Sequence, residues 1–403
     1  MVTLADIQCA AERIDRHIIH TPLVFSPTFS SMCGAPVYLK LETMQRAGSF
    51  KVRGAMNKVL SCREDIGVQG VVTASGGNHA QGVAVAAQTA NVSATVVMPE
   101  TAPLSKQEAS RHYGATVILH GKNLQESVTY ARELEKEGAL FIHPYDDVDV
   151  IAGQGTIALE IYQDLPDADL IIVPVGGGGL ISGIALAAKE TSGSVQVIGV
   201  QAAACPSVYR PFYTGKIEEF TPEPSIADGI TVKQPGEITL ALIRRYVDSL
   251  VLASEEDLAE AMRLLLERKK IIAEGAGAAP LAALLTGNIP VSKNNRIVLV
   301  ISGGNVDNTL LERIIRQGLL KKGKIMRLSV CLDDVPGSLG NLLGLIAQVG
   351  GNIQNINQVR GGRDVPLFTA RVDLEIDTRS PDHIREICRV LEGAGYRIRM
   401  HDY

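Results

Sequence analysis

From residue 70 onward, the sequence alternates short apolar runs rich in β-branched residues with longer stretches of helical spacing. The runs VVTAS, TVVMP, TVILH, LIIVPV, VQVIGVQ and RIVLVIS lack the period-two alternation of a strand with one solvated face. Continuous apolar strands joined by helices indicate parallel strands buried on both faces. We therefore predict an α/β fold with open, mostly parallel sheets that bind ligands at the carboxyl ends of strands. Helices are expected over Asn78 to about Ala90, 104–113, 123–137, 255–270 and 306–317.

The composition changes near residue 324. Three lysines crowd the connector QGLLKKGKIM, and no lysine follows it. Beyond it the pattern predicts a βαββαβ order, which is the ferredoxin-like arrangement. We thus expect a body over residues 1–320, with two α/β lobes of which the smaller covers roughly 45–150, and a separate module over 325–403. The predicted elements of this module are strands over 325–332, 352–360, 365–376 and 396–402, and helices over 338–349 and 380–393.

Composition excludes several classes of protein. The 403-residue chain has a formal net charge of −5 and no basic stripe, which argues against a nucleic-acid partner. No signal peptide and no uncharged apolar stretch of about 18 residues is evident, so we expect a cytoplasmic protein without a membrane span. Its six cysteines are scattered without a CxxC pair, which predicts buried free thiols rather than zinc or disulfides.

Four consecutive glycines, Gly176 to Gly179, follow the run LIIVPV and open a predicted helix. Glycines allow a ligand to approach the backbone closely, and a helix N-terminus presents free N–H groups to an anion. The segment fits neither GxGxxG, because Ile181 or Ser182 stands where the last glycine belongs, nor the P-loop. We interpret it as a monophosphate site, with a tight turn that binds nothing as the alternative.

Two further loops follow predicted strands. The first runs from Thr73 to His79, and its amides and the Ser75 hydroxyl could hold a carboxylate at a helix N-terminus. The second is Ser302 to Asn305. Ordinary helix caps are the alternative in both. We expect all three loops to lie at the carboxyl ends of strands in one sheet, facing one crevice.

Lys51 lies in the glycine-bounded segment GSFKVRG, just before a predicted helix. A solvated lysine is the ordinary interpretation, and a desolvated, reactive amine is the alternative. A monophosphate site, a carboxylate site and an activated lysine together suit pyridoxal phosphate and an amino-acid substrate. HExxH, clustered metal ligands and GxSxG are missing from the sequence, so we expect no metal and no hydrolase triad.

These motifs resemble, in order, those of the fold-type II (tryptophan synthase β-like) pyridoxal-phosphate enzymes, and most closely the threonine ammonia-lyases. The similar segments are KLETMQRAGSFKVRGA, VTASGGNHAQGVA, IAGQGT, PVGGGGLISG, IADGI, AEGAGA and ISGGN, which cover roughly residues 5–320. The resemblance implies deamination of L-threonine, and of L-serine, to a 2-oxo acid and ammonia by α,β-elimination of water. It also implies a role in amino-acid metabolism, either biosynthetic, as in isoleucine biosynthesis, or degradative.

The resemblance carries site roles to individual positions. Lys51 resembles the Schiff-base lysine, which would also take the α-proton, and Ser302 would face the pyridine nitrogen. The residues implied in cofactor binding are Phe50, Lys51, Asn78, Gly176, Gly177, Gly178, Gly179, Leu180, Gly229, Glu274 and Ser302. Those implied in binding the substrate carboxylate are Ser75, Gly76, Gly77, Asn78 and His79.

The C-terminal module resembles an ACT domain, since LDDVPGSLGNLLGLIAQVGGNIQNI carries the D-x-P-G-x-L turn followed by helix and strand. The resemblance implies an amino-acid effector shared between modules of a homodimer or homotetramer. A purely structural oligomerisation module is the alternative. The candidate effector contacts are Asp334, Pro336, Gly337, Leu339 and Asn352.

Serine racemases of this fold carry a second serine in the carboxylate loop, where this chain has Gly76. They also use acidic metal ligands, which the segment 201–207 (QAAACPS) lacks, although a monovalent cation stays open. The competing hypotheses are a serine racemase, a β-replacement enzyme and an amino-acid-sensing regulatory protein without catalysis.

Overall fold

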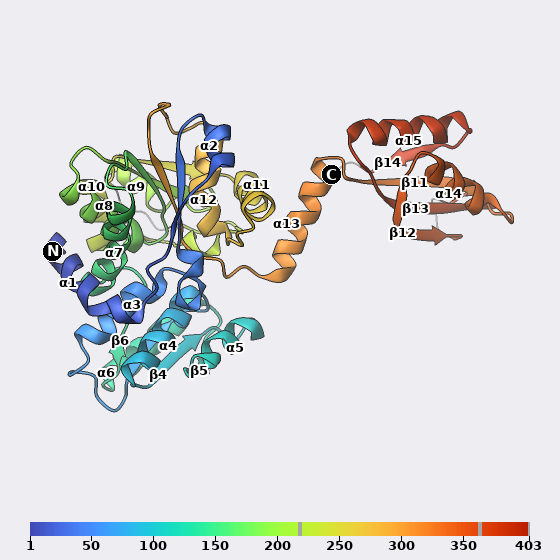
Figure 1. The fold of residues 1–403 in the computed structure, drawn as a ribbon. Coiled ribbons are helices and arrows are strands. Elements are labelled where there is room, and N and C mark those ends of the chain that lie inside the picture. The colour runs from blue at the N-terminus through green and yellow to red at the C-terminus, as the bar shows by residue number, and fades with distance from the viewer. Residues whose placement is uncertain (217–219, 362–364, 402–403) are drawn as a thin grey trace. The chain divides into compact units, whose positions relative to one another are not determined.

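The computed structural model describes residues 1–216, 220–361 and 365–401. The chain divides into two compact units, a first unit over Met1–Asp307 and a second unit over Asn308–Tyr403 (Figure 1). The expected final strand reaches residue 402, which lies outside the described residues. No helix in the described ranges is long and apolar enough to cross a membrane.

A six-stranded sheet forms the core of the large lobe of the first unit, in the order β1-β2-β10-β7-β8-β9. All neighbouring strands pair in parallel except β1 and β2, which are antiparallel. Residues on β7 and β10 are buried throughout, as the absence of period-two alternation predicted. The strands are β1 (Leu23–Phe25), β2 (Val37–Leu41), β7 (Leu170–Pro174), β8 (Gln196–Ala202), β9 (Ser249–Ala253) and β10 (Ile297–Ile301).

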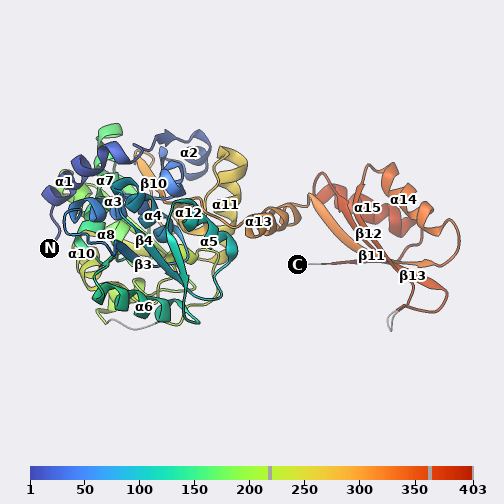
Figure 2. The ribbon, with the colours of Figure 1, turned by 90° about the horizontal axis from the view of Figure 1, so that it is seen from below.

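A second, wholly parallel sheet of four strands forms the small lobe, in the order β5-β4-β3-β6. Helices α4 and α6 pack against it (Figure 2). The predicted α/β class with mostly parallel sheets is therefore confirmed. The elements are β3 (Val71–Ala74), α4 (Asn78–Ala90), β4 (Ala94–Met98), α5 (Leu104–His112), β5 (Thr116–Leu119), α6 (Leu124–Lys136) and β6 (Leu140–Phe141).

Helices α3 (Lys51–Ser61) and α7 (Val148–Asp164) connect the two lobes, because α3 packs against both α4 and α7 while α7 packs against α8. Glycines at the crossings permit this close approach; a Cβ on Gly153 of α7 would lie 2.6 Å from the Arg53 carbonyl oxygen. The other helices of the first unit are α1 (Leu4–Ile14), α2 (Pro27–Cys33), α8 (Gly179–Thr191), α9 (Tyr209–Thr214), α10 (Glu237–Tyr246), α11 (Glu255–Leu264) and α12 (Gly275–Leu285).

The second unit begins with helix α13 (Asn308–Lys321) and continues into a four-stranded antiparallel sheet in the order β12-β13-β11-β14. Together with two helices, these strands have the predicted βαββαβ order, so the ferredoxin-like pattern is confirmed. Its elements are β11 (Ile325–Asp333), α14 (Ser338–Gln348), β12 (Asn352–Val359), β13 (Thr369–Asp377), α15 (Pro381–Gly393) and β14 (Ile398–Met400).

Two expectations from the sequence were wrong. The three loops do not follow strands of one sheet: Thr73–His79 follows β3 in the small lobe, whereas the other two follow β7 and β10 in the large lobe. The three loops therefore belong to two different lobes. The cysteines are free, but only Cys205 is buried, and Cys9 and Cys331 are exposed.

Candidate active site

Lys51 is the first residue of α3. Its Nζ donates a hydrogen bond to the carbonyl oxygen of Pro144 at 2.8 Å and lies 5.2 Å from the centre of the Phe50 ring. Burial lowers the pKa of Lys51 to about 8, against the charge of Glu274, which raises it. An amine with this pKa is neutral often enough near pH 7 to act as a nucleophile.

The backbone around Lys51 is held from two sides. Ser49 pairs with Gly303 in an antiparallel bridge, and the Phe50 amide donates to the Ser302 carbonyl at 3.0 Å, which ties the segment to the loop after β10. On the other side, a Cβ on Gly82 of α4 would lie 3.0 Å from the Lys51 carbonyl carbon. Lys51 is thus fixed between the two lobes.

The glycine cup, Gly176–Gly179, opens α8, with Gly178 as N-cap at φ +98°. Among the residues that the structure describes, no amide from Gly176 to Leu180 donates to a protein acceptor. A side chain would not fit here, because a Cβ on Gly177 would overlap the Tyr145 ring and one on Gly179 would lie 2.9 Å from the Tyr145 Cα. Unpaired amides at a helix N-terminus are suited to an anion.

A brace that the sequence did not reveal supports this cup. Thr239 Oγ1 donates to the Gly177 carbonyl at 2.7 Å, which fixes one peptide of the cup. The Asp146 carboxylate accepts from the amides of Glu237 and Thr239 at 3.1 and 3.0 Å, and so caps the N-terminus of α10. Asp146 lies some 90 positions before the helix that it caps, so no local sequence pattern could reveal this contact.

The loop after β3 presents a second group of unpaired amides. The amides of Gly76, Asn78 and His79 donate to no acceptor among the described residues. The His79 side chain is buried, and its Nε2 lies 3.0 Å from the Ile142 carbonyl, so Nε2 carries the proton. Burial lowers the pKa of His79 to about 3, which keeps the ring neutral. The ring has no N–H left for a carboxylate, so a contact to substrate at His79 falls to its backbone amide.

Asn78 joins the loop of the small lobe to the large lobe. Its Nδ2 donates to Glu274 Oε1 at 2.7 Å, and its Oδ1 accepts from Asn305 Nδ2 at 2.8 Å. Glu274 is the N-cap residue of α12, and burial raises its pKa to about 7 despite the hydrogen bond from Asn78, which lowers it. Asn305 also donates to the Ala47 carbonyl at 2.7 Å. Sequence reasoning treated Asn305 only as a cap, and the structure makes it a link between three loops.

Gly229 and Ser302 complete the set of predicted positions. A Cβ on Gly229 would lie 3.9 Å from Glu274 Oε1, and the Gly229 carbonyl lies 3.0 Å from the Cβ position of Gly176. Ser302 is 1% exposed, and its hydroxyl makes no hydrogen bond to the described part of the chain. Contacts therefore link the predicted residues of the first unit into one region where the two lobes meet.

The donors of this candidate site fit a phosphorylated cofactor with a carbonyl group. Two sets of unpaired amides and a lysine with a lowered pKa converge there. Two buried polar atoms in the same region, Ser49 Oγ and His79 Nδ1, have no hydrogen-bond partner among the described residues. Unsatisfied buried groups are rare in folded proteins, and a ligand bound here could satisfy these two. The described residues contain no group of three or more His, Cys, Asp or Glu side chains arranged for a metal ion.

Fold and site together define the class of a protein that holds an anionic, amine-reactive cofactor between two α/β lobes. The family model of the pyridoxal-phosphate dependent enzymes matches residues 14–303. The chain belongs to this family, and pyridoxal phosphate is its cofactor.

Two relatives match nearly the whole chain. An L-threonine ammonia-lyase of Thermotoga maritima is 46% identical over 402 residues, which cover 99% of this chain and 100% of the relative. An L-threonine ammonia-lyase of Geobacter sulfurreducens is 45% identical over 97% of this chain and 98% of its own. Among solved structures, the T.th. threonine deaminase is 40% identical, with a TM-score of 0.72 over 76% of this chain and 99% of that one. Maize serine racemase is 33% identical, with a TM-score of 0.74 over 79% and 98%.

The second unit contains a cavity of about 370 Å³ at the turn between β11 and α14. Four of the predicted effector contacts line it, namely Asp334, Pro336, Gly337 and Leu339. Asn352 does not, because it lies on β12 and donates to Asp377 Oδ2 at 3.0 Å. Arg360, which sequence reasoning missed, also lines the cavity, and its Nε donates to Asp334 Oδ1 at 3.0 Å.

Proposed function

We propose that this protein is an L-threonine ammonia-lyase, which converts L-threonine to 2-oxobutanoate and ammonia and L-serine, more slowly, to pyruvate and ammonia. The observation that carries the proposal is the Lys51 amine, whose pKa burial lowers to about 8, together with two separate groups of unpaired amides from the two lobes. The two nearly full-length relatives that are L-threonine ammonia-lyases support the choice of reaction.

In this proposal the cup amides of Gly176–Gly179 and Leu180 hold the cofactor phosphate. Phe50 would contact the ring, Asn78 would hydrogen-bond its 3′-oxygen, Gly229 and Glu274 would contact its edge, and the Ser302 hydroxyl would bind its nitrogen. The Ser75–His79 loop binds the substrate carboxylate through its amides and the Ser75 hydroxyl. The cup amides, the amides of Gly76, Asn78 and His79, and the Ser302 hydroxyl have no partner among the described residues, which supports their assignments.

Lys51 does the proton chemistry in this scheme. Pyridoxal phosphate, when bound, supplies an electron sink for the pair left at the substrate Cα. The neutral Nζ of Lys51 would take the α-proton, and this proton would balance the one with which the β-hydroxyl leaves as water. Addition of one water to the enamine released would then give the 2-oxo acid and ammonia. A serine hydroxyl at the ring nitrogen, unlike a carboxylate, does not enforce a protonated ring, which favours prompt elimination over reprotonation at Cα.

The test is formation of 2-oxobutanoate and ammonia from L-threonine by the purified protein, with Lys51→Ala as the control. We expect loss of activity and of the visible absorbance of the lysine-bound cofactor in the variant. Absence of keto acid from both threonine and serine would overturn the proposal. A colourless protein that still binds amino acids would favour the regulatory alternative.

A serine racemase is the second candidate, because racemases such as the maize enzyme share the fold of the first unit. Gly76 argues against it, since a glycine at this position has no side chain that could serve as the second acid or base. Chiral analysis of serine after incubation separates the two activities. Incubation with sulfide and O-acetylserine tests the β-replacement alternative.

For the second unit, we propose an ACT domain that binds an amino acid. The cavity of about 370 Å³ and its Asp334–Arg360 ion pair support this, because a carboxylate and a guanidinium can hold the amino and carboxylate groups of such a ligand. Leu367 and Phe368 are 87% and 90% exposed, and the Phe368 carbonyl accepts from the Asp334 amide at 2.9 Å. Large apolar residues exposed beside the cavity support pairing with a second copy in a homodimer or homotetramer.

Calorimetric titration with isoleucine, valine and threonine tests the ACT proposal. Asp334→Asn should weaken the binding of the effector about tenfold or more, since it removes a charged contact. The exposed Asp382→Asn on α15 serves as the matched control and should bind normally. A cavity that takes up none of these amino acids would favour the purely structural module.

A further inference from the structure

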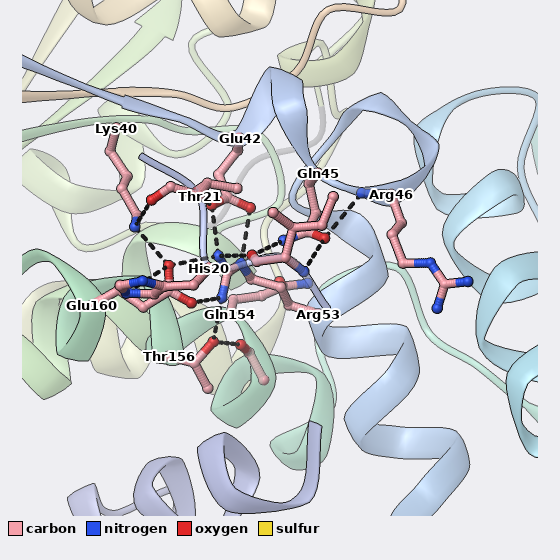
Figure 3. Close-up of polar contacts among 12 residues, drawn as sticks. His20, Thr21, Lys40, Glu42, Gln45, Arg46, Arg53, Gln154, Thr156 and Glu160 are labelled. Carbon is pink, nitrogen blue, oxygen red and sulfur yellow. Dashed lines mark hydrogen bonds and ion pairs between the residues drawn. The ribbon is translucent and has the colours of Figure 1, made fainter. Parts of the chain in front are cut away.

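A cluster of buried charged side chains lies where the two lobes meet (Figure 3). We call Arg53, Glu42, Glu160 and Lys40, with Thr21 and Thr156, the Arg53 cluster. Arg53, Glu42, Lys40 and Thr21 are 0% exposed, and Glu160 is 8% exposed. The proposed reaction uses none of these side chains, so their burial needs a separate explanation.

Arg53 uses every N–H of its guanidinium. Nε and Nη2 donate to the two oxygens of Glu42, each at 2.8 Å, and Nη1 and Nη2 donate to the two oxygens of Glu160 at 2.6 and 2.9 Å. The remaining Nη1 hydrogen reaches Thr156 Oγ1 at 3.2 Å. Two bidentate carboxylates fix the plane of the guanidinium, which a lysine ammonium cannot reproduce.

Lys40 and Thr21 close the network. Lys40 Nζ donates to Glu160 Oε2 and to the Thr21 carbonyl, each at 2.6 Å, and Thr21 Oγ1 donates to Glu42 Oε1 at 2.6 Å. Two cations balance two carboxylates. Such buried networks contribute little stability compared with apolar packing of the same volume, but they define one arrangement of the elements that they join.

The cluster joins elements of both lobes. Lys40 lies on β2 of the six-stranded sheet and Glu42 directly follows that strand, whereas Glu160 lies on α7. Arg53 lies on α3, whose apolar residues Val52 and Met56 belong to the core of the small lobe. The network therefore ties the first turn of a helix packed in the small lobe to the sheet of the large lobe.

Lys51 precedes Arg53 by two residues, a rotation of about 200° around the helix axis, so the two side chains leave α3 on opposite faces. The glycine cup and Ser302 both follow strands of the large lobe. An amine that must meet a cofactor held there needs a fixed position relative to that lobe. The hydrogen bond from the Phe50 amide to the Ser302 carbonyl provides one such link. The Arg53 cluster provides a second link, on the face of α3 opposite Lys51.

We propose that the Arg53 cluster is a positioning device, in which Arg53 holds the N-terminal turn of α3 so that Lys51 stays aligned with the cofactor site of the large lobe. This inference rests on the proposed role of Lys51. It predicts that loosening the cluster displaces the amine from its buried position without removing any group that contacts cofactor or substrate.

The test uses full-length protein stripped of pyridoxal phosphate and then reloaded across a pH series. Attachment at Lys51 is followed by visible absorbance and by borohydride trapping with peptide mass spectrometry. The ionisable groups that interact with Lys51 are Glu274, His79 and His143, and the variants leave all three unchanged. The variants are Arg53→Lys, Thr156→Val and Thr156→Ser. Arg263→Lys is the matched control, because Arg263 is also buried against two carboxylates but lies on α11.

In Arg53→Lys we expect the pH midpoint of attachment to rise by about one unit, as the amine becomes better solvated. We expect its dissociation constant for pyridoxal phosphate to rise about tenfold. Thr156→Val should move both quantities in the same direction by less, with a melting temperature near that of the unsubstituted protein, and Thr156→Ser should restore them. Arg263→Lys should change the melting temperature alone.

Unchanged midpoints and dissociation constants in the folded Arg53→Lys and Thr156→Val variants would overturn the inference. If Arg53→Lys does not fold, Thr156→Val decides alone. Failure of the unsubstituted protein to attach pyridoxal phosphate at Lys51 would instead overturn the proposed function, so the two failures are distinguishable.

Discussion

Two ionisable side chains, Lys51 and Glu274, interact across the candidate active site, and burial shifts their pKa values in opposite directions. Burial lowers the pKa of Lys51 to about 8 and raises that of Glu274 to about 7, so each group is driven towards its neutral form. Near pH 8 the Glu274 carboxyl is mostly ionised, and its negative charge stabilises the protonated amine. The two residues therefore set the pH range in which Lys51 can act as a nucleophile.

Glu274→Gln should move the attachment of pyridoxal phosphate at Lys51 to lower pH. Removing the negative charge removes the interaction that raises the pKa of Lys51, while the glutamine oxygen can still accept from Asn78 Nδ2. We expect attachment to rise through a midpoint near pH 8 in the unsubstituted protein and below pH 8 in the variant. Spectroscopic titration of the stripped protein measures both, and an upward shift would contradict the prediction.

Gly177→Ala should abolish tight binding of pyridoxal phosphate. The new Cβ would overlap the Tyr145 ring, so either the ring or the cup must shift, and overpacking of this kind costs about 1–3 kcal/mol of folding stability. Gly193→Ala is the matched control, because no atom lies within 4 Å of its Cβ position. Equilibrium dialysis with pyridoxal phosphate and thermal melting measure both effects, and normal binding by Gly177→Ala would show that the cup is not the phosphate site.

Lys51 and the four glycines could be singled out from sequence, because glycine runs and a glycine-bounded lysine are local signals, and their roles stay predictions. Tyr145, Thr239 and Asn305 could not be singled out. Each contacts the site through a side chain whose partners lie 32 or more positions away, as with Thr239 Oγ1 and the Gly177 carbonyl. The hydrogen bonding of the His79 ring also depends on a long-range contact, since the Ile142 carbonyl takes its only N–H.

At the scale of elements, the strand-to-helix loops were predictable and the sheets were not. Each buried strand has a continuous apolar run in the sequence, so β3, β7 and β10 were located correctly. Which strands pair depends on the whole chain: β10 pairs with β2, some 260 residues earlier. The assumption of a single sheet therefore failed, and with it the expectation that the crevice would lie along one sheet edge.

Asp146→Ala should weaken both helix α10 and the cofactor site. It removes the carboxylate that caps the helix, at a cost of about 1–2 kcal/mol, and frees Thr239 to release the Gly177 carbonyl. We expect a weaker affinity for pyridoxal phosphate together with a lower free energy of unfolding. Asn123→Ala, which removes the cap of α6, is the matched control and should lower stability alone. Equal cofactor affinities in the two variants would contradict the role of the brace.

At the scale of the whole molecule, the second unit is separable from the reaction site. The candidate active site is built wholly from residues before Asp307, and each unit has its own hydrophobic core. The T.th. threonine deaminase matches 76% of this chain with 99% of its own, so its chain is about a quarter shorter. The first unit thus contains the groups that the proposed reaction requires.

Ending the chain at Lys321, after α13, should leave deamination of L-threonine within about twofold of the full-length rate and remove any response to added amino acids. The reason is that every proposed cofactor and substrate contact stays, while the cavity around Asp334 is deleted. Initial rates of 2-oxobutanoate formation with and without isoleucine measure both properties, and size-exclusion chromatography reports the oligomeric state. If the shortened protein keeps its cofactor but loses its activity, the second unit supports catalysis through assembly. If it keeps its response to isoleucine, the effector binds the first unit and the ACT proposal is wrong.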